Sequence, residues 1–559
     1  MTCSTGGTVS GCTMRNSTET GIVAGGRSTT VFKDLVITDT LGCGFLLVSE
    51  CAIQVEGCLI QGKHVNGIQV GDRSNPTVRK NVIRNSQGSG IVLHDSSRGV
   101  FSLNDIFESK LAGVGVRDRC CPIFHHNVIS KGDGSGIVLL GSSGGVYESN
   151  VVSHNKCAGI GLKGDADALF DGNQINHNEG YGVWLQDYAK GTFQNNMIES
   201  NTMAGISVNN NAAPMVQHNT VKDGKQVGLL LQHKGGGTFA HNTLTSNKAA
   251  NVLLMGSSNC VVSHNKVLGS KGGGVLIRGD AVCHLTFNTI ALNSRANLAV
   301  LDRSVPHVEG NNISEGSGRG MVITGMARGV YKNNTISIHR LAGVYIGGQA
   351  SPEMLNNVVE KAGASGIVIE DSATGVFSGN TVSGNECAAV AVQGKASPHM
   401  KENVVIHQGK GGIWLGESAS GNFLDNLVED CESGWRIGSS VTATVIGNKT
   451  VKLEEAMDRV RLSGTRAIAQ QKMVVVVNPD GEAMDRTLVG VQVRAIALCR
   501  PQQASSQAWK SRGANSTCTN LDVESTECID KSCHSPMSKV ESADTSAHGM
   551  LSEDPCISG

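Results

Sequence analysis

A 23-residue period runs through most of this chain and restricts the possible folds more than any other feature. The residue that opens each "G-I-x-V" step recurs eighteen times at this spacing, and fifteen of these positions hold glycine. Glycine and asparagine tolerate a left-handed backbone best, so we interpret the position as a tight corner repeated in every turn, with Ala389 strained or locally rearranged. The positions are Gly21, Gly44, Gly67, Gly90, Gly113, Gly136, Gly159, Gly182, Gly205, Gly228, Asn251, Gly274, Asn297, Gly320, Gly343, Gly366, Ala389 and Gly412.

A second set of positions holds asparagine sixteen times without exception. Stacked amides can donate to and accept from one another along a column, and can also bond the backbone of a bend. The three earlier slots hold Cys12, Leu35 and Cys58. The asparagines are Asn81, Asn104, Asn127, Asn150, Asn173, Asn196, Asn219, Asn242, Asn265, Asn288, Asn311, Asn334, Asn357, Asn380, Asn403 and Asn426.

Apolar residues alternate around both sets of positions, as in Ile91 and Leu93 or Val183 and Leu185. Alternation over four to six residues indicates strands. Short strands at a fixed period, with no helical segment between them, predict an all-β fold, a right-handed single-stranded parallel β-helix or solenoid. About nineteen turns of 23 residues, stacked at ~4.8 Å, would give a rod on the order of 90 Å long.

The repeat also has a two-turn period. One slot holds mostly proline in every second turn and mostly glycine in the turns between. Proline is tolerated at the start of a strand, where no backbone donor is needed for the sheet. The first set is Pro76, Pro122, Ala168, Pro214, Cys260, Pro306, Pro352 and Pro398. The second set is Gly99, Gly145, Gly191, Gly237, Cys283, Gly329, Gly375 and Gly421.

Composition and pattern divide the chain into three parts: a β-helix over 1–451, a capping or irregular segment with an internal duplication over 452–499, and a disordered tail over 500–559 that is rich in Ser, Thr, Gln and acids. The net charge of −1 offers nothing to nucleic acid or an anionic membrane. We find no signal peptide and no apolar run that would span a bilayer. The 17 cysteines are odd in number and irregularly spaced, which indicates reduced thiols and a cytoplasmic or nuclear protein.

The pair of turns "AGVYIGGQASPEMLNNVVEKAGASGIVIEDSATGVFSGNTVSGN" (342–385) resembles the β-helix of the F-box-only ubiquitin-ligase adaptors. The resemblance covers about residues 60–450 and implies a scaffold that holds a protein substrate for ubiquitination, with a ligase complex as a further partner. No F-box precedes the repeats here, so we expect another chain or a missing segment to cover the N-terminal end. The zinc domain of that family is matched only by sparsely spaced residues, namely Cys499, Cys518, Cys528, Cys533, His534 and Cys556.

Acidic residues form the best candidate for a chemical site. Asp72, Asp95 and Asp118 follow three successive corners, and His94 adjoins Asp95. Stacked carboxylates can share a proton, bind calcium or act as general acid and base. Aspartates in turns more often bond backbone amides, and we favour that interpretation.

Apolar residues recur at the second position after the corner, which should face outward. An apolar stripe of this length usually marks a contact surface, so we expect it to bind an extended peptide or protein substrate. Its residues are Val92, Val138, Trp184, Leu230, Leu276, Val322, Tyr345, Val368 and Trp414.

Two functions therefore remain open. The first, which we favour, is a non-catalytic protein-recognition scaffold with no catalytic residue, cofactor or metal. The alternative is a carbohydrate-binding or polysaccharide-modifying β-helix protein, an epimerase, lyase or hydrolase that uses the acidic stack. The sequence leaves enzymatic activity undecided.

Overall fold

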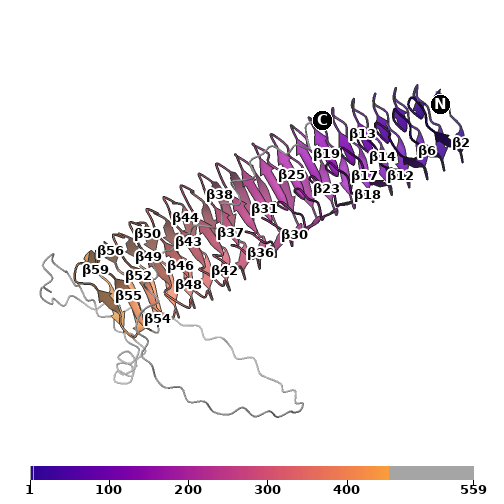
Figure 1. The fold of residues 1–559 in the computed structure, drawn as a ribbon. Helices are drawn as coiled ribbons and strands as arrows, with labels where there is room; N and C mark the ends of the chain where they lie inside the picture. The colour runs from indigo at the N-terminus through magenta and orange to yellow at the C-terminus, as the bar shows by residue number, and fades with distance from the viewer. Residues whose placement is uncertain (1, 4–5, 409, 452–559) are drawn as a thin grey trace, which may run out of the picture. The chain divides into compact units, whose positions relative to one another are not determined.

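The computed structural model describes residues 2–3, 6–408 and 410–451, and these form an all-β, right-handed parallel β-helix (Figure 1). The chain divides into two units, Met1–Val493 and Arg494–Gly559, and every described residue belongs to the first. The expected capping segment (452–499), the expected tail (500–559) and the sparse Cys/His residues lie outside the described ranges. No helix within those ranges is long and apolar enough to cross a bilayer.

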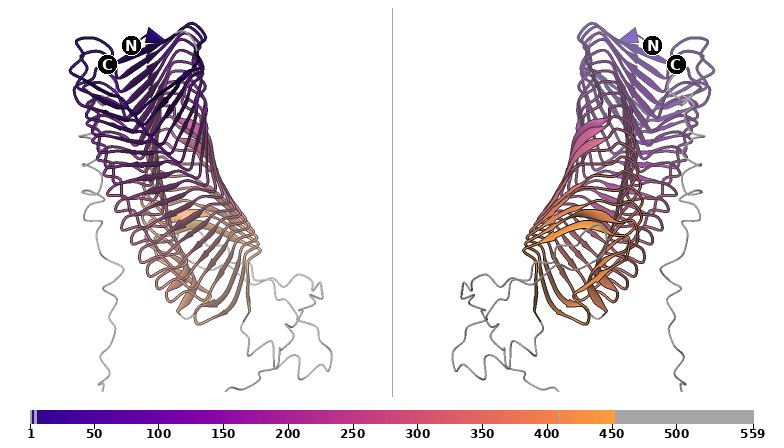
Figure 2. Two further views of the ribbon diagram at one scale, coloured as in Figure 1. Left: turned by 90° about the vertical axis from the view of Figure 1, so that its right-hand side faces the viewer. Right: turned by 90° about the vertical axis from the view of Figure 1, so that its left-hand side faces the viewer.

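Each turn contributes one short strand to each of three parallel sheets. Sheet A begins with β1 (Thr2–Cys3), sheet B with β2 (Thr8–Ser10) and sheet C with β3 (Thr13–Arg15), and each contains twenty strands. A typical turn consists of β13 (Ile91–Leu93), β14 (Val100–Ser102) and β15 (Asp105–Phe107). The last described strand is β60 (Lys449–Val451), and Figure 2 shows the turns stacked without interruption up to it.

The strands pair with their equivalents one period away, so like residues lie above one another. Ile91 pairs with Ile68 of β10 (Ile68–Val70) and with Val114 of β16 (Val114–Val116). In sheet B, Phe101 stacks on Phe124 with ring centroids 4.4 Å apart, and Phe170 stacks on Phe193 at 4.7 Å. These columns of equivalent side chains form the core, which is why so few aromatic residues suffice.

The buried asparagine ladder is confirmed. The side chain of Asn81 donates to Oδ1 of Asn104 at 2.9 Å and to the carbonyl of Val55 at 3.0 Å, and its backbone N–H donates to the same Oδ1 at 3.1 Å. The same three bonds recur along the ladder, for example from Asn219 to Asn242 and Phe193. Each amide therefore bonds to its neighbour and to two backbone groups of the bend.

The explanation of the corner glycines was wrong. None of them has a positive φ. A Cβ on Gly90 would lie 2.4 Å from Cγ2 of Ile106 and 2.7 Å from the carbonyl oxygen of Gly113. Glycine is needed there because the corner presses against a sheet C side chain and the next turn, and not because of its backbone freedom. At Ala389 the expected strain is not seen: its φ is not positive, and β52 (Ala388–Val392) begins one residue before the corner just as β55 (Gly411–Leu415) does at Gly412.

The left-handed backbone occurs instead in the other bends. After sheet A two residues in succession are left-handed, such as Asp72 (φ 48°) and Arg73 (φ 58°), and the later bends use residues such as Lys80 and Asn85. Asparagine and aspartate adopt this conformation more readily than most residues. Most of these bends therefore carry polar side chains, although Leu103, Phe287, Leu292 and Ile338 are apolar, left-handed and exposed.

The two-turn period has a steric cause. Gly237 has φ 108°, and a Cβ there would lie 2.4 Å from the carbonyl oxygen of Pro214 in the preceding turn and 3.1 Å from its ring. Gly145, Gly329, Gly375 and Gly421 meet the preceding proline in the same way. Cys260 and Cys283 replace the proline and the glycine where β35 (Asn259–Ser263) and β38 (Val282–Thr286) pair regularly. Where a turn carries proline in this slot, the next turn carries glycine.

We predict that Gly237→Ala lowers the free energy of unfolding by more than ~2 kcal/mol, because the added carbon meets backbone and the φ is unfavourable. Gly115→Ala is the matched control: its Cβ would meet nothing nearer than 3.9 Å, and the free energy should change by no more than ~0.5 kcal/mol. Denaturant unfolding of both variants measures this, and equal losses would contradict the explanation.

A buried histidine makes stability depend on pH. His339 is 2% exposed, its Nε2 accepts from Nδ2 of Asn297 at 3.1 Å, and its Nδ1 has no partner among the described residues. Burial lowers its pKa to about 4. The unfolded chain takes up this proton below about pH 6.5 and the folded chain only below about pH 4, so falling pH in this window favours unfolding.

We therefore expect His339→Asn to remove part of the loss of stability between pH 6.5 and 4, at most ~3 kcal/mol. Asparagine fits because Asn293 and Asn385 occupy equivalent slots in other turns. Denaturant unfolding at several pH values checks the prediction. An unchanged pH dependence in the variant would show that His339 does not cause it.

Candidate functional site

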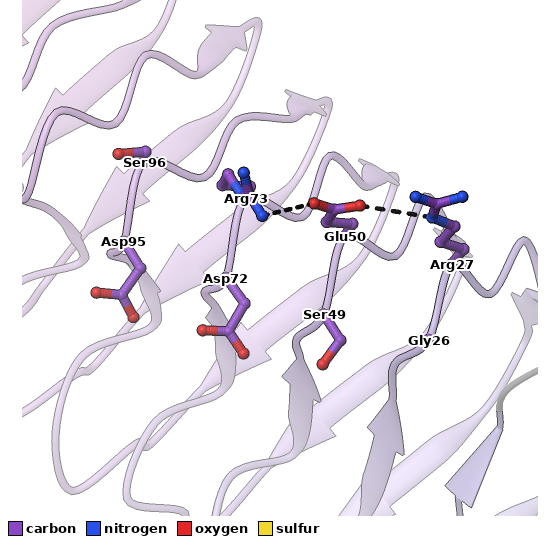
Figure 3. A pocket seen from close by; sticks show the side chains of 8 residues that line it. All are labelled: Gly26, Arg27, Ser49, Glu50, Asp72, Arg73, Asp95 and Ser96. Carbon is purple, nitrogen blue, oxygen red and sulfur yellow. Dashed lines mark ion pairs between the residues drawn. The ribbon is translucent and has the colours of Figure 1, made fainter.

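A polar groove crosses four turns at the bend that follows sheet A (Figure 3). It follows β4 (Ile22–Ala24), β7 (Phe45–Leu47), β10 and β13, and its volume is about 780 Å³. Each turn contributes two successive residues, all left-handed. The lining residues are Gly26, Arg27, Ser49, Glu50, Asp72, Arg73, Asp95 and Ser96.

One border of the groove carries a row of alternating charges. Oε1 of Glu50 lies 2.8 Å from Nη2 of Arg73, and its Oε2 lies 3.5 Å from Nε of Arg27 (Figure 3). All three side chains are solvent-exposed, and such pairs contribute little to stability because water screens them. They are therefore free to rearrange around a ligand.

The carboxylates of Asp72 and Asp95 point side by side from the groove (Figure 3). At the equivalent slot further along, Asp302 accepts the N–H of Gly279 at 2.9 Å and Asp371 accepts that of Gly348 at 2.8 Å. The side-chain carboxylates of Asp72 and Asp95 accept no backbone N–H from the described residues, and that of Asp95 accepts from His94 instead. The favoured interpretation, that aspartates at this slot bond the turn backbone, holds for Asp302 and Asp371 and fails for these two.

His94 lies between Asp95 and sheet A. Its Nδ1 donates to Oδ2 of Asp95 at 2.6 Å, and its Nε2 accepts from Nε2 of Gln69 at 3.0 Å. The ring covers Gly71, where a Cβ would lie 2.5 Å from the ring carbon Cε1. Gln69 in turn accepts from Nδ2 of Asn66 at 3.2 Å and from the Cys43 thiol at 3.3 Å. Burial raises the pKa of Cys43, which keeps this thiol protonated as a donor.

This network leaves His94 without a free lone pair. The proton on Nδ1 faces Asp95, and the Gln69 amide occupies the lone pair on Nε2, so the imidazole orients Asp95 and is not poised as a general base. The groove therefore offers carboxylates, guanidinium groups and hydroxyls that can bind a polar ligand.

The structure brings together three of the four residues of the expected acidic site. Asp72 and Asp95 line the groove and His94 supports it, whereas Asp118 lies one turn beyond and faces Arg117 at 3.4 Å. Sequence analysis missed Arg27, Ser49 and Glu50, although applying the 23-residue register to the two preceding turns would have found them. It also missed Cys43 and the role of Gln69, which only the side-chain contacts reveal.

The expected apolar stripe lies along the outer face of sheet A, as its register requires. Trp184 and Val138 are each only 8% exposed, and Tyr345 is 2% exposed beneath the guanidinium of Arg319. Val92, Leu230, Leu276, Val322, Val368 and Trp414 are half-buried. Its role in binding remains a prediction.

Metal coordination finds no support in the described part of the chain, where no three His, Cys, Asp or Glu side chains are grouped to hold an ion.

Comparison with known families supports the fold. The family model described as "Right handed beta helix region" matches residues 66–201, 113–267 and 250–405, which together exceed half of the chain. The model "Periplasmic copper-binding protein (NosD)" matches residues 1–121. No curated protein matches, and nothing found supports the resemblance to the F-box adaptors.

Three solved structures show a distant similarity to this chain. The periplasmic alginate epimerase AlgG is 12% identical with a TM-score of 0.33, over 57% of this chain and 76% of that chain. The A-module of Azotobacter vinelandii mannuronan C-5 epimerase AlgE6 is 13% identical with a TM-score of 0.20, over 73% and 90%. The tailspike protein 3 of bacteriophage CBA120 is 11% identical with a TM-score of 0.26, over 65% and 56%.

The predicted cytoplasmic or nuclear location is wrong. It is contradicted by the family model matched over residues 1–121, which is described as a periplasmic protein. The inference from cysteine failed because many thiols serve as small core residues: Cys51, Cys58, Cys120, Cys260 and Cys283 are free and at most 3% exposed. A buried free thiol reports on packing and not on the compartment.

Proposed function

The chain belongs to the family of right-handed β-helix regions, and from this premise and the geometry of the groove we propose that it is a carbohydrate-binding protein that holds an extended, hydroxyl-rich polysaccharide along the groove. The observation that carries the proposal is the pair of carboxylates, Asp72 and Asp95, that the turn backbone does not use.

Sugar hydroxyl groups suit these side chains. A carboxylate accepts hydrogen bonds from two hydroxyls at once, and such charge-assisted bonds are about twice as strong as neutral ones. Ser49 and Ser96 add hydroxyls on either side, and Arg27 and Arg73 add donors. Because successive turns repeat at ~4.8 Å, the groove presents similar groups at regular intervals, which suits a polymer of similar units.

Binding is a better match than catalysis. Hydrolysis, elimination or epimerisation of a sugar needs a group that moves a proton. The lone pair of His94 is already engaged by Gln69, so this role would fall to the carboxylates of Asp72 and Asp95 without help from the imidazole. The open groove also lacks the enclosure that excludes water from most catalytic sites. The proposal is therefore a lectin-like protein.

The second candidate, a protein-recognition scaffold of the F-box-adaptor kind, would use the outer column of sheet A. Leu230, Val322 and Trp414 favour this candidate, because each is half-buried and offers an apolar side chain that a partner could contact. The burial of Trp184 and Tyr345 interrupts the column, so a continuous seat for a peptide is less well supported than the groove.

We expect the protein to retain one class of neutral polysaccharide on a glycan array, screened with and without divalent cations. The double substitution Asp72→Asn and Asp95→Asn should weaken binding at least tenfold, because an amide loses the charge-assisted bonds. Asp187→Asn is the matched control, since Asp187 occupies the same left-handed slot (φ 65°) outside the groove. An array blank under all conditions would contradict the proposal and favour the protein scaffold, and equal effects of both changes would exclude the groove as the site.

A further inference from the structure

Three consecutive turns carry a histidine at the bend before sheet C and a lysine at the bend after it. Their segments read HNTVKDGK (218–225), HNTLTSNK (241–248) and HNKVLGSK (264–271). The fold explains the asparagine of the ladder and the core residue two positions later. It does not require the histidine that opens each segment or the lysine that closes it.

Strand pairing aligns these residues in columns. The segments contain β30 (Thr220–Lys222), β33 (Thr243–Thr245) and β36 (Lys266–Leu268), which pair in register, and β30 and β36 are labelled on one side of the stack in Figure 1. The histidines lie at the bend before sheet C and the lysines at the bend after it. All six are solvent-exposed. They therefore border a face that we call the His–Lys face, with Thr220, Thr243 and Lys266 between them.

The histidine rings are stacked. The rings of His218 and His241 are 5.1 Å apart and inclined by 5°, and those of His241 and His264 are 5.1 Å apart and inclined by 27°. Their ring nitrogens contact no donor or acceptor among the described residues. Stacking restricts the rings, so the face presents a row of nitrogen atoms at the spacing of the turns.

The three lysines have no acidic residue between them, unlike the lysines at the equivalent positions of earlier turns. There, Asp133 pairs with both Lys110 and Lys156 at 2.7 Å. Lys225, Lys248 and Lys271 follow one another directly, and within the described residues none of them forms an ion pair. Lys225 donates only to Oγ1 of Thr202, at 3.3 Å.

Like charges on neighbouring rungs repel one another. Lys266 adds a further exposed positive charge to the middle of the face, whereas Lys222 is paired with Glu199 at 3.0 Å and lies beside the exposed Asp223. The excess of positive charge therefore lies mainly on the turns of Lys248 and Lys271. A surface that concentrates one sign of charge attracts ligands of the opposite sign. The face is thus suited to an anion with several charges in a row.

We propose that the His–Lys face is a second binding site, which takes an acidic linear polysaccharide whose carboxylate or sulfate groups recur along the polymer. Threonine hydroxyls and imidazole nitrogens contact the sugar hydroxyls, and the lysines contact the acidic groups. Nucleic acid is a poorer match, because single strands are held by aromatic side chains on which bases stack, and here the ring faces are stacked on one another and, at His264, on the exposed Phe287. The proposal does not depend on the groove, which lies several turns away.

The test uses the full chain and four probes at one pH and salt concentration: polygalacturonate, dextran sulfate, neutral dextran and single-stranded DNA. Lys225→Gln, Lys248→Gln and Lys271→Gln are combined in one variant. Lys80→Gln, Lys190→Gln and Lys395→Gln form the matched control, which removes the same charge from exposed positions elsewhere. A third variant combines His218→Asn, His241→Asn and His264→Asn, which the backbone accepts because Asn195, Asn333 and Asn356 are left-handed at the same slot.

We expect at least one acidic polysaccharide to bind, with the comparison of polygalacturonate and dextran sulfate identifying the acidic group. The lysine variant should lose at least tenfold in affinity, the histidine variant several-fold, and the control less than twofold. Tighter binding of DNA, equal binding of neutral dextran, or equal losses in the lysine variant and its control would overturn the proposal. Groove variants should leave this binding unchanged, so failure here and failure of the groove proposal are distinguishable.

Discussion

The buried asparagine ladder is the interaction on which the rest of the structure depends. Each side chain donates to the asparagine one turn away and to a carbonyl of the preceding turn, and accepts from the backbone and side chain of its other neighbour, as Asn104 and Asn127 show. Such bonds contribute ~0.5–1.5 kcal/mol each, and a buried group left without its partner costs ~1–3 kcal/mol. A turn that slipped by one residue would break these bonds and would also reverse its apolar side chains. The ladder therefore fixes which residues lie above one another from Asn81 to Asn448, at 23 residues per turn except for a last step of 22.

Once the register is fixed, only certain positions are free to carry function. Inward positions must hold the apolar side chains of the core. The corner positions must hold a small residue because of close contacts, and the Pro/Gly slot is fixed by the contact between successive turns. The bends and outward slots remain. The groove and the His–Lys face both consist of such positions, with equivalent residues repeated on neighbouring turns. A solenoid built in this way presents rows of similar groups, which suits polymers better than small compact ligands.

Much of this could be predicted from the sequence because periodicity reports directly on stacking. The ladder, the core columns and the parallel strands followed from residue spacing alone. The role of Gly90 could not be predicted in this way. A close contact with Ile106 and a left-handed backbone both require glycine, so the sequence does not distinguish them. The support of Asp95 by His94 and Gln69 was also beyond the sequence, since it depends on how an imidazole lies over Gly71. The location was wrong because cysteine content does not separate packed thiols from those of a reducing compartment.

The most direct test of the account is thermal unfolding, followed by circular dichroism, of a chain that lacks two whole turns. Deletion of residues 205–250 removes one Pro/Gly pair of turns and joins Ala204 to Asn251 in register. The account predicts a β-rich spectrum and cooperative unfolding within several degrees of the intact chain, whereas deletion of 205–238, which ends within a turn, should abolish the transition. Equal tolerance of both deletions, or loss of the fold in both, would contradict the claim that turns stack as interchangeable units in one register.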